Sequence, residues 1–143
     1  MGGRARPGTL FDAGRARPLT GSPVDKLTLD DVRFFGRHGV TKAEESVGAW
    51  FSVDVALSID LTPAAVSDEL SAAVDYGAVA KRVVEIGMGP RVNLIERLAG
   101  QIAQTLLREF PTQQVRVRVR KLTPPLEGLV GTPSVELTRR RGP

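Results

Sequence analysis

Strict alternation of hydrophobic and polar residues predicts two β-strands. In residues 51–61, six apolar residues occupy every second position, and serine, aspartate and one alanine stand between them. Residues 115–120 alternate valine with arginine in the same way. A two-residue period with one apolar face is typical of an antiparallel strand that buries one side against a core.

Two weaker patterns predict a strand at each end of this region. Residues 26–36 (KLTLDDVRFFG) form the first predicted strand, and residues 134–138 (SVELT) form the last. Glycines frame a predicted loop over 37–48, and a second loop covers 122–133. Within the first strand the apolar residues change parity, from Leu27 and Leu29 to Val32 and Phe34.

A period near 3.6 residues predicts two helices between the second and third strands. After Pro63 and a short segment rich in Ala, Ser and Asp, the first helix runs from about Tyr76 to Ile86, with Val79, Val83 and Ile86 on its buried stripe. The second runs from about Leu94 to Phe110, before Pro111. Its predicted buried residues are Leu94, Leu98, Ile102 and Leu106.

The order β-β-α-α-β-β predicts an α+β domain, with two helices on one face of a four-stranded antiparallel sheet. We place this domain at residues 24–139, after an extension over 1–23 that is rich in Gly, Pro and Arg and is expected to be disordered. Residues 140–143 form a basic tail. The open edges of so small a sheet favour side-by-side oligomers.

Charge and composition narrow the function classes. The net charge is +4, and residues 1–23 and 139–141 contribute +3 each, which leaves −2 for residues 24–138. A basic RNA-binding module therefore remains only as an alternative, because the body is near neutral. With no cysteine and one histidine, we expect no disulfide, metal site or cofactor. Without a long apolar run, a cytoplasmic protein is expected.

Lys121 ends the alternation of valine and arginine over residues 115–120, because this charged residue falls on the parity of the valines. Either the strand has already ended and the lysine extends into solvent, or it is partly buried beside a carboxylate and can exchange protons near neutral pH. Glu44 and Glu45 are candidate partners, although adjacent loop glutamates are usually solvated. The spacing of residues leaves both interpretations open.

Two more residues, Glu96 and Tyr76, have both a structural and a functional interpretation. Asn93 and Glu96 have the spacing of a helix capping box, but Glu96 could instead bind a ligand that presents two N–H groups. Tyr76, the only tyrosine, is either a packing residue or a proton donor. For His38, in the turn after Gly36, we expect a role in anchoring the loop.

Taken in chain order, four motifs resemble the dihydroneopterin aldolase family. They are RFFGRHGVTKAEESVGAWFSVDVALSIDL, VDYGAV, VNLIERLA and VRVRKLTPPLEG, and the resemblance covers about residues 26–139. It implies the tunnelling fold, in which small subunits form tetrameric rings, commonly stacked as a homo-octamer with active sites between neighbours. It also implies a lyase of folate biosynthesis that converts 7,8-dihydroneopterin into 6-hydroxymethyl-7,8-dihydropterin and glycolaldehyde. Family members need no metal, and many also epimerise C2′.

By position, the resemblance assigns roles to six residues. Lys121 matches the lysine that relays protons, and Glu44 matches the glutamate beside the substrate side chain. Tyr76 matches a tyrosine that the adjoining subunit supplies for protonation of the enol. The pterin is expected to contact the residues Val74, Ile95 and Glu96.

The chain also departs from the family pattern. Glu127 replaces the last proline of the usual Pro-Pro-Ile-Pro-Gly, and Ala73 stands where threonine is common. The aromatic-acidic pair that usually follows is absent, and the chain has LVGTPSVEL in its place. These changes affect the loop after Lys121 and leave the six positions intact. The nearest alternative activity is that of a dihydroneopterin or dihydroneopterin triphosphate epimerase.

Overall fold

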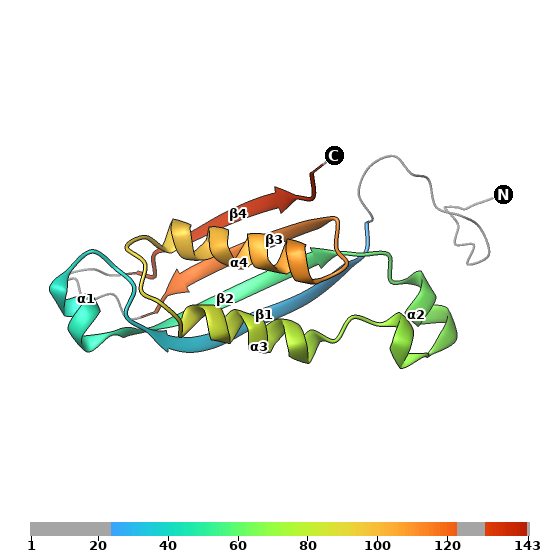
Figure 1. Cartoon of the computed structure of the whole chain (residues 1–143), viewed down its shortest axis with the longest axis horizontal. Coiled ribbons are helices and arrows are strands. Elements are labelled where there is room, and N and C mark those ends of the chain that lie inside the picture. Colours follow the sequence, from blue (N-terminus) through green and yellow to red (C-terminus); the bar gives the residue numbers. More distant parts are fainter. Residues whose placement is uncertain (1–23, 123–130, 143) are drawn as a thin grey trace.

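A computed structural model of the chain describes residues 24–122 and 131–142. These residues form one antiparallel sheet of four strands, with two long helices on one face (Figure 1). The predicted α+β fold and element order are therefore confirmed. The strands lie across the sheet in the order of the chain: β1 (Lys26–Gly36), β2 (Ala49–Ser58), β3 (Gln114–Lys121) and β4 (Ser134–Arg140).

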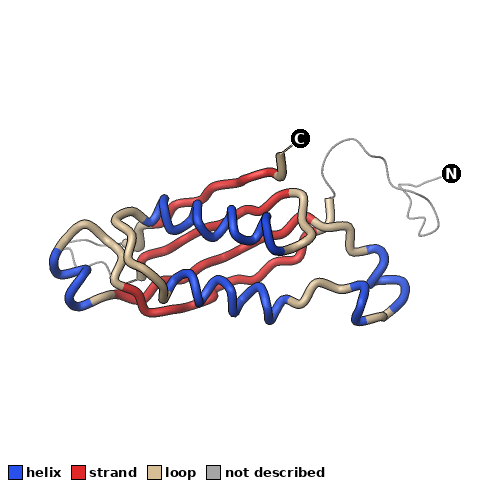
Figure 2. The backbone as a smooth tube through the Cα atoms, viewed as in Figure 1, coloured by secondary structure: helices blue, strands red, loops and turns tan. Residues whose placement is uncertain are grey.

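The long helices α3 (Tyr76–Gly87) and α4 (Ile95–Glu109) lie side by side over the sheet (Figure 2) and run in opposite directions along it (Figure 1). Their apolar stripes meet the valines of β2 and β3 in a single core. One predicted core residue is wrong: Leu94 is 52% exposed, because it precedes the first turn of α4. The predicted stripe residues with no exposed surface are Val79, Val83, Leu98, Ile102 and Leu106.

The change of parity in β1 has a structural cause. The pairing of β1 with β2 shifts register between Leu29 and Val32, which is the geometry of a β-bulge. At the bulge Asp31 has φ 62°, a left-handed conformation that aspartate tolerates better than most residues. The extra residue turns Val32 back toward the core, so both halves of the strand bury their apolar side chains.

The structure adds short helices to two predicted connections and moves the end of one predicted strand. The predicted loop 37–48 contains a short helix, α1 (Lys42–Val47). Strand β2 ends at Ser58, three residues before the predicted end of the alternation. The connecting segment then forms α2 (Thr62–Ser67), which has a proline in its first turn, and a 3₁₀ turn over Leu70–Ala72.

The arginines of β3 lie on the sheet face opposite the helices, where acidic residues pair with two of them. The guanidinium of Arg120 donates to both carboxylate oxygens of Asp54, at 2.9 and 2.5 Å. This interaction lowers the pKa of Asp54 below its ordinary value. Arg116 makes a longer ion pair with Glu136, at 3.4 Å. Two of the alternating arginines of β3 therefore belong to ion pairs on this face of the sheet.

Some sequence-based predictions lie outside the described residues. These are the disordered extension over 1–23 and most of the altered loop that contains Glu127. Among the described residues, no helix is both long enough and apolar enough to cross a membrane.

Candidate active site

The loop before α1 folds around the carboxylate of Glu44. Thr41 is the N-cap of α1, and its hydroxyl accepts a hydrogen bond from the backbone N–H of Glu44 at 3.1 Å. In return, Oε1 of Glu44 accepts from the backbone N–H groups of Thr41 and Val40, at 3.1 and 3.0 Å. These reciprocal bonds form a capping box that fixes one carboxylate oxygen and leaves the other free to face β3.

Lys121 is the residue that this second oxygen meets. The Nζ of Lys121 donates a hydrogen bond to Oε2 of Glu44, and the two side chains are only 14% and 8% exposed. Lys121 pairs with Phe51 across the sheet, so it keeps the parity of the buried valines. Of the two interpretations of this lysine, the structure supports the partly buried one, and it identifies Glu44 rather than the exposed Glu45 as the partner.

The environment of Glu44 keeps its carboxyl group ionised. Burial by itself would raise the pKa, but the hydrogen bond from Lys121, the backbone N–H of Thr41 and the charge of Lys121 outweigh burial. The pKa of Glu44 is therefore below its ordinary value of 4.5. The result is a charged, oriented carboxylate and ammonium at the end of β3.

Gly39 is required by the close approach of this carboxylate. A Cβ atom at position 39 would lie 2.3 Å from Cδ of Glu44, and the φ of Gly39 is +146°. Both the space and the backbone conformation therefore exclude an ordinary side chain. The Gly39 backbone N–H also donates to the carbonyl of Val92, at 3.0 Å.

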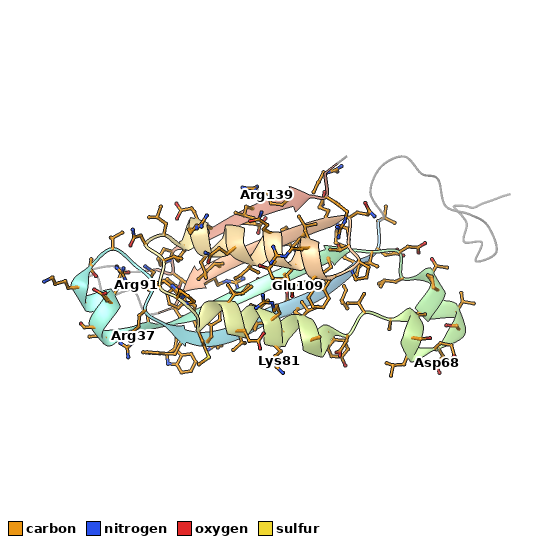
Figure 3. The ribbon with its side chains drawn as sticks, in the orientation of Figure 1. Arg37, Asp68, Lys81, Arg91, Glu109 and Arg139 are labelled. Atoms are coloured by element: carbon orange, nitrogen blue, oxygen red, sulfur yellow. The ribbon has the colours of Figure 1, made fainter. Side chains whose placement is uncertain are left out.

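His38 anchors the loop, as the sequence led us to expect. Its ring is 1% exposed and lies edge-on to Phe51, with centroids 5.4 Å apart. Nε2 lies 2.7 Å from the carbonyl oxygen of Gly87, and Nδ1 accepts from the N–H of Val92 at 3.1 Å. Arg91, which Figure 3 shows near the α1 end of the molecule, donates to the carbonyl of Gly39 at 2.5 Å.

Glu96 and Ile95 begin α4, at the end of the molecule where β3 finishes (Figure 1). The predicted capping box of Asn93 and Glu96 is wrong, because the N-cap is Leu94 and makes no side-chain cap bond. Glu96 is exposed, and its carboxylate has no partner among residues 24–122 and 131–142. In the first turn of α4, this carboxylate is free to bind a ligand.

Tyr76 and Val74 lie at the other end of α3. Tyr76 is the first residue of α3 and is 63% exposed. The last residue of that helix, Gly87, touches His38, so the helix separates Tyr76 from the Glu44 loop by about 16 Å at 1.5 Å per residue. Within one chain, therefore, Glu44 and Lys121 meet, Glu96 lies at the same end, and Tyr76 and Val74 do not.

The capping box and the two long-range contacts of His38 were missed from the sequence alone. The Thr41-Lys-Ala-Glu44 segment carries the S/T-x-x-E signature of a capping box, so a local signal was present. The contacts of His38 with Gly87 and Val92 span 49 and 54 residues, and no local signal indicates them. Among the described residues, no group of three or more His, Cys, Asp or Glu residues could hold a metal ion.

The described residues form a small α+β domain with a buried Glu–Lys pair at one end of its sheet, and comparison with known proteins gives its family. The sequence model of dihydroneopterin aldolase matches residues 27–138. The chain belongs to the dihydroneopterin aldolase family and is a lyase of folate biosynthesis. The epimerase and RNA-binding alternatives are not favoured.

Individual relatives agree with this assignment. A dihydroneopterin aldolase of Streptococcus pyogenes is 41% identical over 119 residues, which is 82% of this chain and 100% of that protein. One from Staphylococcus epidermidis is 39% identical over 116 residues, 80% of this chain and 96% of that protein. The crystal structure of Escherichia coli dihydroneopterin aldolase in complex with neopterin superposes with a TM-score of 0.74 at 26% identity, covering 80% of this chain and 98% of that one.

Proposed function

We propose that the chain cleaves the side chain of 7,8-dihydroneopterin at a site built around Glu44 and Lys121. The observation that carries this proposal is the buried Glu44–Lys121 pair at the end of β3, where a charged acid and base are held next to each other. The related Escherichia coli enzyme was crystallised with neopterin, which supports a pterin as the ligand.

In the proposed reaction, the hydroxyl on C2′ loses its proton and the C1′–C2′ bond breaks. C2′ leaves as the aldehyde carbon of glycolaldehyde, and the bonding electron pair passes into the pterin ring. C1′ then takes up a proton, which yields 6-hydroxymethyl-7,8-dihydropterin. Because the ring accepts the electrons, the protein must supply only positioning and proton transfer.

Lys121 relays the hydroxyl proton: its ammonium passes one proton to water and then takes up the proton of the C2′ hydroxyl. Glu44 orients Nζ of Lys121 toward the substrate side chain. The capping box supports this division of roles, because it holds Oε1 of Glu44 and leaves Oε2 facing Lys121. A group whose rotamer is locked by other bonds makes a better catalyst than a mobile one, since less reorganisation is needed during the reaction.

Glu96 and Ile95 bind the pterin ring. The exposed Glu96 carboxylate can accept hydrogen bonds from two adjacent N–H groups, which a pterin presents on its amino group and ring nitrogen. The Ile95 backbone N–H in the first turn of α4 is not needed within the helix, so it is available to the ligand.

Tyr76 and Val74 complete the site from a second copy of the chain. Their position at the far end of α3 from Glu44 supports this, because one subunit cannot bring Tyr76 and Lys121 together. We infer a homo-oligomer, a ring tetramer or octamer, in which Tyr76 of one copy protonates the enol formed at Lys121 of its neighbour. The exposed strand edges β1 and β4 are available to join such copies.

The test is release of glycolaldehyde from 7,8-dihydroneopterin by the purified protein. Replacing Lys121 by alanine is expected to lower kcat by about 10²–10⁴-fold, the usual contribution of a positioned acid or base. The matched control is Lys42→Ala, which removes an exposed lysine from α1 beside Glu44. No release by the wild-type protein refutes the proposed activity, and full activity of the Lys121 variant refutes the role of the lysine.

A further inference from the structure

We propose that His38 is a positioning residue that holds the two halves of the active site in register, through a clamp formed with Gly39, Gly87, Arg91 and Val92. One half is the loop that carries Glu44, and the other is the segment that leads into Ile95 and Glu96. This inference rests on the proposed function of those residues.

The hydrogen bonds of the clamp determine the state of the His38 ring. The N–H of Val92 points at Nδ1, so Nδ1 must be an unprotonated acceptor. Nε2 then carries the ring's single proton and donates it to the carbonyl of Gly87. A neutral imidazole satisfies both neighbours at once.

The surroundings of His38 favour this neutral ring. Burial lowers the pKa of His38 below its ordinary value of 6.5, and the charges of Arg91 and Lys121 lower it further. The Gly87 carbonyl acts in the opposite direction but does not outweigh them. Protonated Nδ1 would also confront the Val92 N–H with a second donor, so the charged ring would break the clamp.

The clamp joins the loop to Val92 in both directions. His38 accepts from the Val92 N–H at 3.1 Å, and the Gly39 N–H donates to the Val92 carbonyl at 3.0 Å. Arg91 adds a bond to the Gly39 carbonyl. Since Gly39 packs directly against the Glu44 carboxylate, displacement of Val92 would displace Glu44 as well.

Val92 is also close in sequence to the proposed pterin-binding residues. Ile95 and Glu96 follow it by three and four residues, at the start of α4. The same backbone segment therefore fixes where the pterin would lie and where Glu44 and Lys121 would meet its side chain. A misplacement of about 1 Å between such groups costs on the order of 100-fold in rate.

Two amide substitutions separate the two bonds of His38. Asparagine places its Oδ1 near the position of Nδ1, so His38→Asn keeps an acceptor for the Val92 N–H and loses the hydrogen bond to the Gly87 carbonyl. The amide nitrogen of glutamine reaches the position of Nε2, so His38→Gln keeps the hydrogen bond to the Gly87 carbonyl and loses the acceptor for the Val92 N–H. We expect His38→Gln to lower both kcat and neopterin affinity by about 10- to 100-fold, whereas His38→Asn stays within about threefold of the wild type.

Thr112→Val is the matched control for loss of a buried hydrogen bond. Thr112 is 1% exposed and donates to the Ser58 carbonyl at 3.0 Å, where α4 leads into β3, far from the clamp. This variant should lose stability while kcat per folded molecule stays within about twofold. Equal losses in kcat for Thr112→Val and His38→Gln, or an unchanged His38→Gln, would overturn the proposal.

Hydrogen exchange gives a readout that does not require turnover. In His38→Gln, exchange should accelerate together in residues 40–48 and 93–98, while acceleration in one segment alone contradicts the clamp.

If wild-type protein releases no glycolaldehyde, the proposed function fails while exchange still tests the clamp. If His38→Gln does not fold, Arg91→Ala replaces it. That variant should accelerate exchange in the same two segments, and unchanged exchange in both overturns the proposal.

Discussion

Replacing Glu44 by glutamine isolates the charge of the buried pair. Glutamine keeps the shape of the side chain and an oxygen that can accept from Val40 and Thr41, so the capping box can survive. What disappears is the negative charge facing Lys121, whose side chain is only 14% exposed. The ammonium of Lys121 is then left largely buried without its partner.

The size of the effect follows from this burial. Breaking a buried ion pair by removing one partner costs about 3–5 kcal/mol. Because Lys121 retains some exposure, its ammonium can move toward water, and we expect a cost of about 2–3 kcal/mol. At roughly 4 °C per kcal/mol for a domain of this size, Tm should fall by about 8–12 °C. Adding Lys121→Met removes the orphaned charge, so the double variant should be more stable than Glu44→Gln alone.

Urea denaturation at pH 7.5 and one fixed protein concentration measures these free energies. The pKa of Glu44 is lower in the folded protein than its ordinary 4.5, so the stability that it contributes is complete above pH 4.5. That contribution is lost as the pH falls through the folded value, and the difference between wild type and variant should shrink there. A loss below about 0.5 kcal/mol, or one that does not depend on Lys121, would refute the pair as an energetic unit.

Two further predictions concern the geometry of the site. Gly39→Ala should lower kcat by about 100-fold, because its Cβ would displace the Glu44 carboxylate. Gly131→Ala is its control, since Gly131 also has a positive φ, +133°, but no atom of the described residues lies within 4 Å of a Cβ placed there; equal kcat losses would contradict the steric argument. Lys121→Ala and Tyr76→Ala subunits, each inactive alone, should regain about a quarter of wild-type activity when unfolded and refolded together, because neighbours would share each site. A mixture as inactive as its parts would place both residues in one subunit's site.

Local patterns in the sequence determined most of the fold. Alternation of apolar and polar residues located β2 and β3, and the 3.6-residue period located α3 and α4. These patterns are reliable because each element must bury one face, whichever element it packs against. The Thr41–Glu44 capping box is also encoded locally, because the sequence carries its Thr-x-x-Glu signature.

Burial and pairing across the chain were decided by the tertiary structure. Leu94 carries the helical period, yet it is exposed because α4 begins one residue later. The parity change in β1 was visible in the sequence, but only the pairing with β2 made it a bulge. The parity of Lys121 allowed either solvent or burial, and the choice depended on Glu44, which lies 77 residues away in the chain.

The same division holds for the candidate active site. The sequence by itself determined which residue types are present and which face of a strand or helix each one occupies, because those properties depend only on near neighbours. Only the tertiary structure decided that Glu44 meets Lys121, that His38 joins the Glu44 loop to Val92, and that Tyr76 lies at the far end of α3. Contacts between distant residues depend on the packing of every element that lies between them, and local periodicity carries no record of that packing.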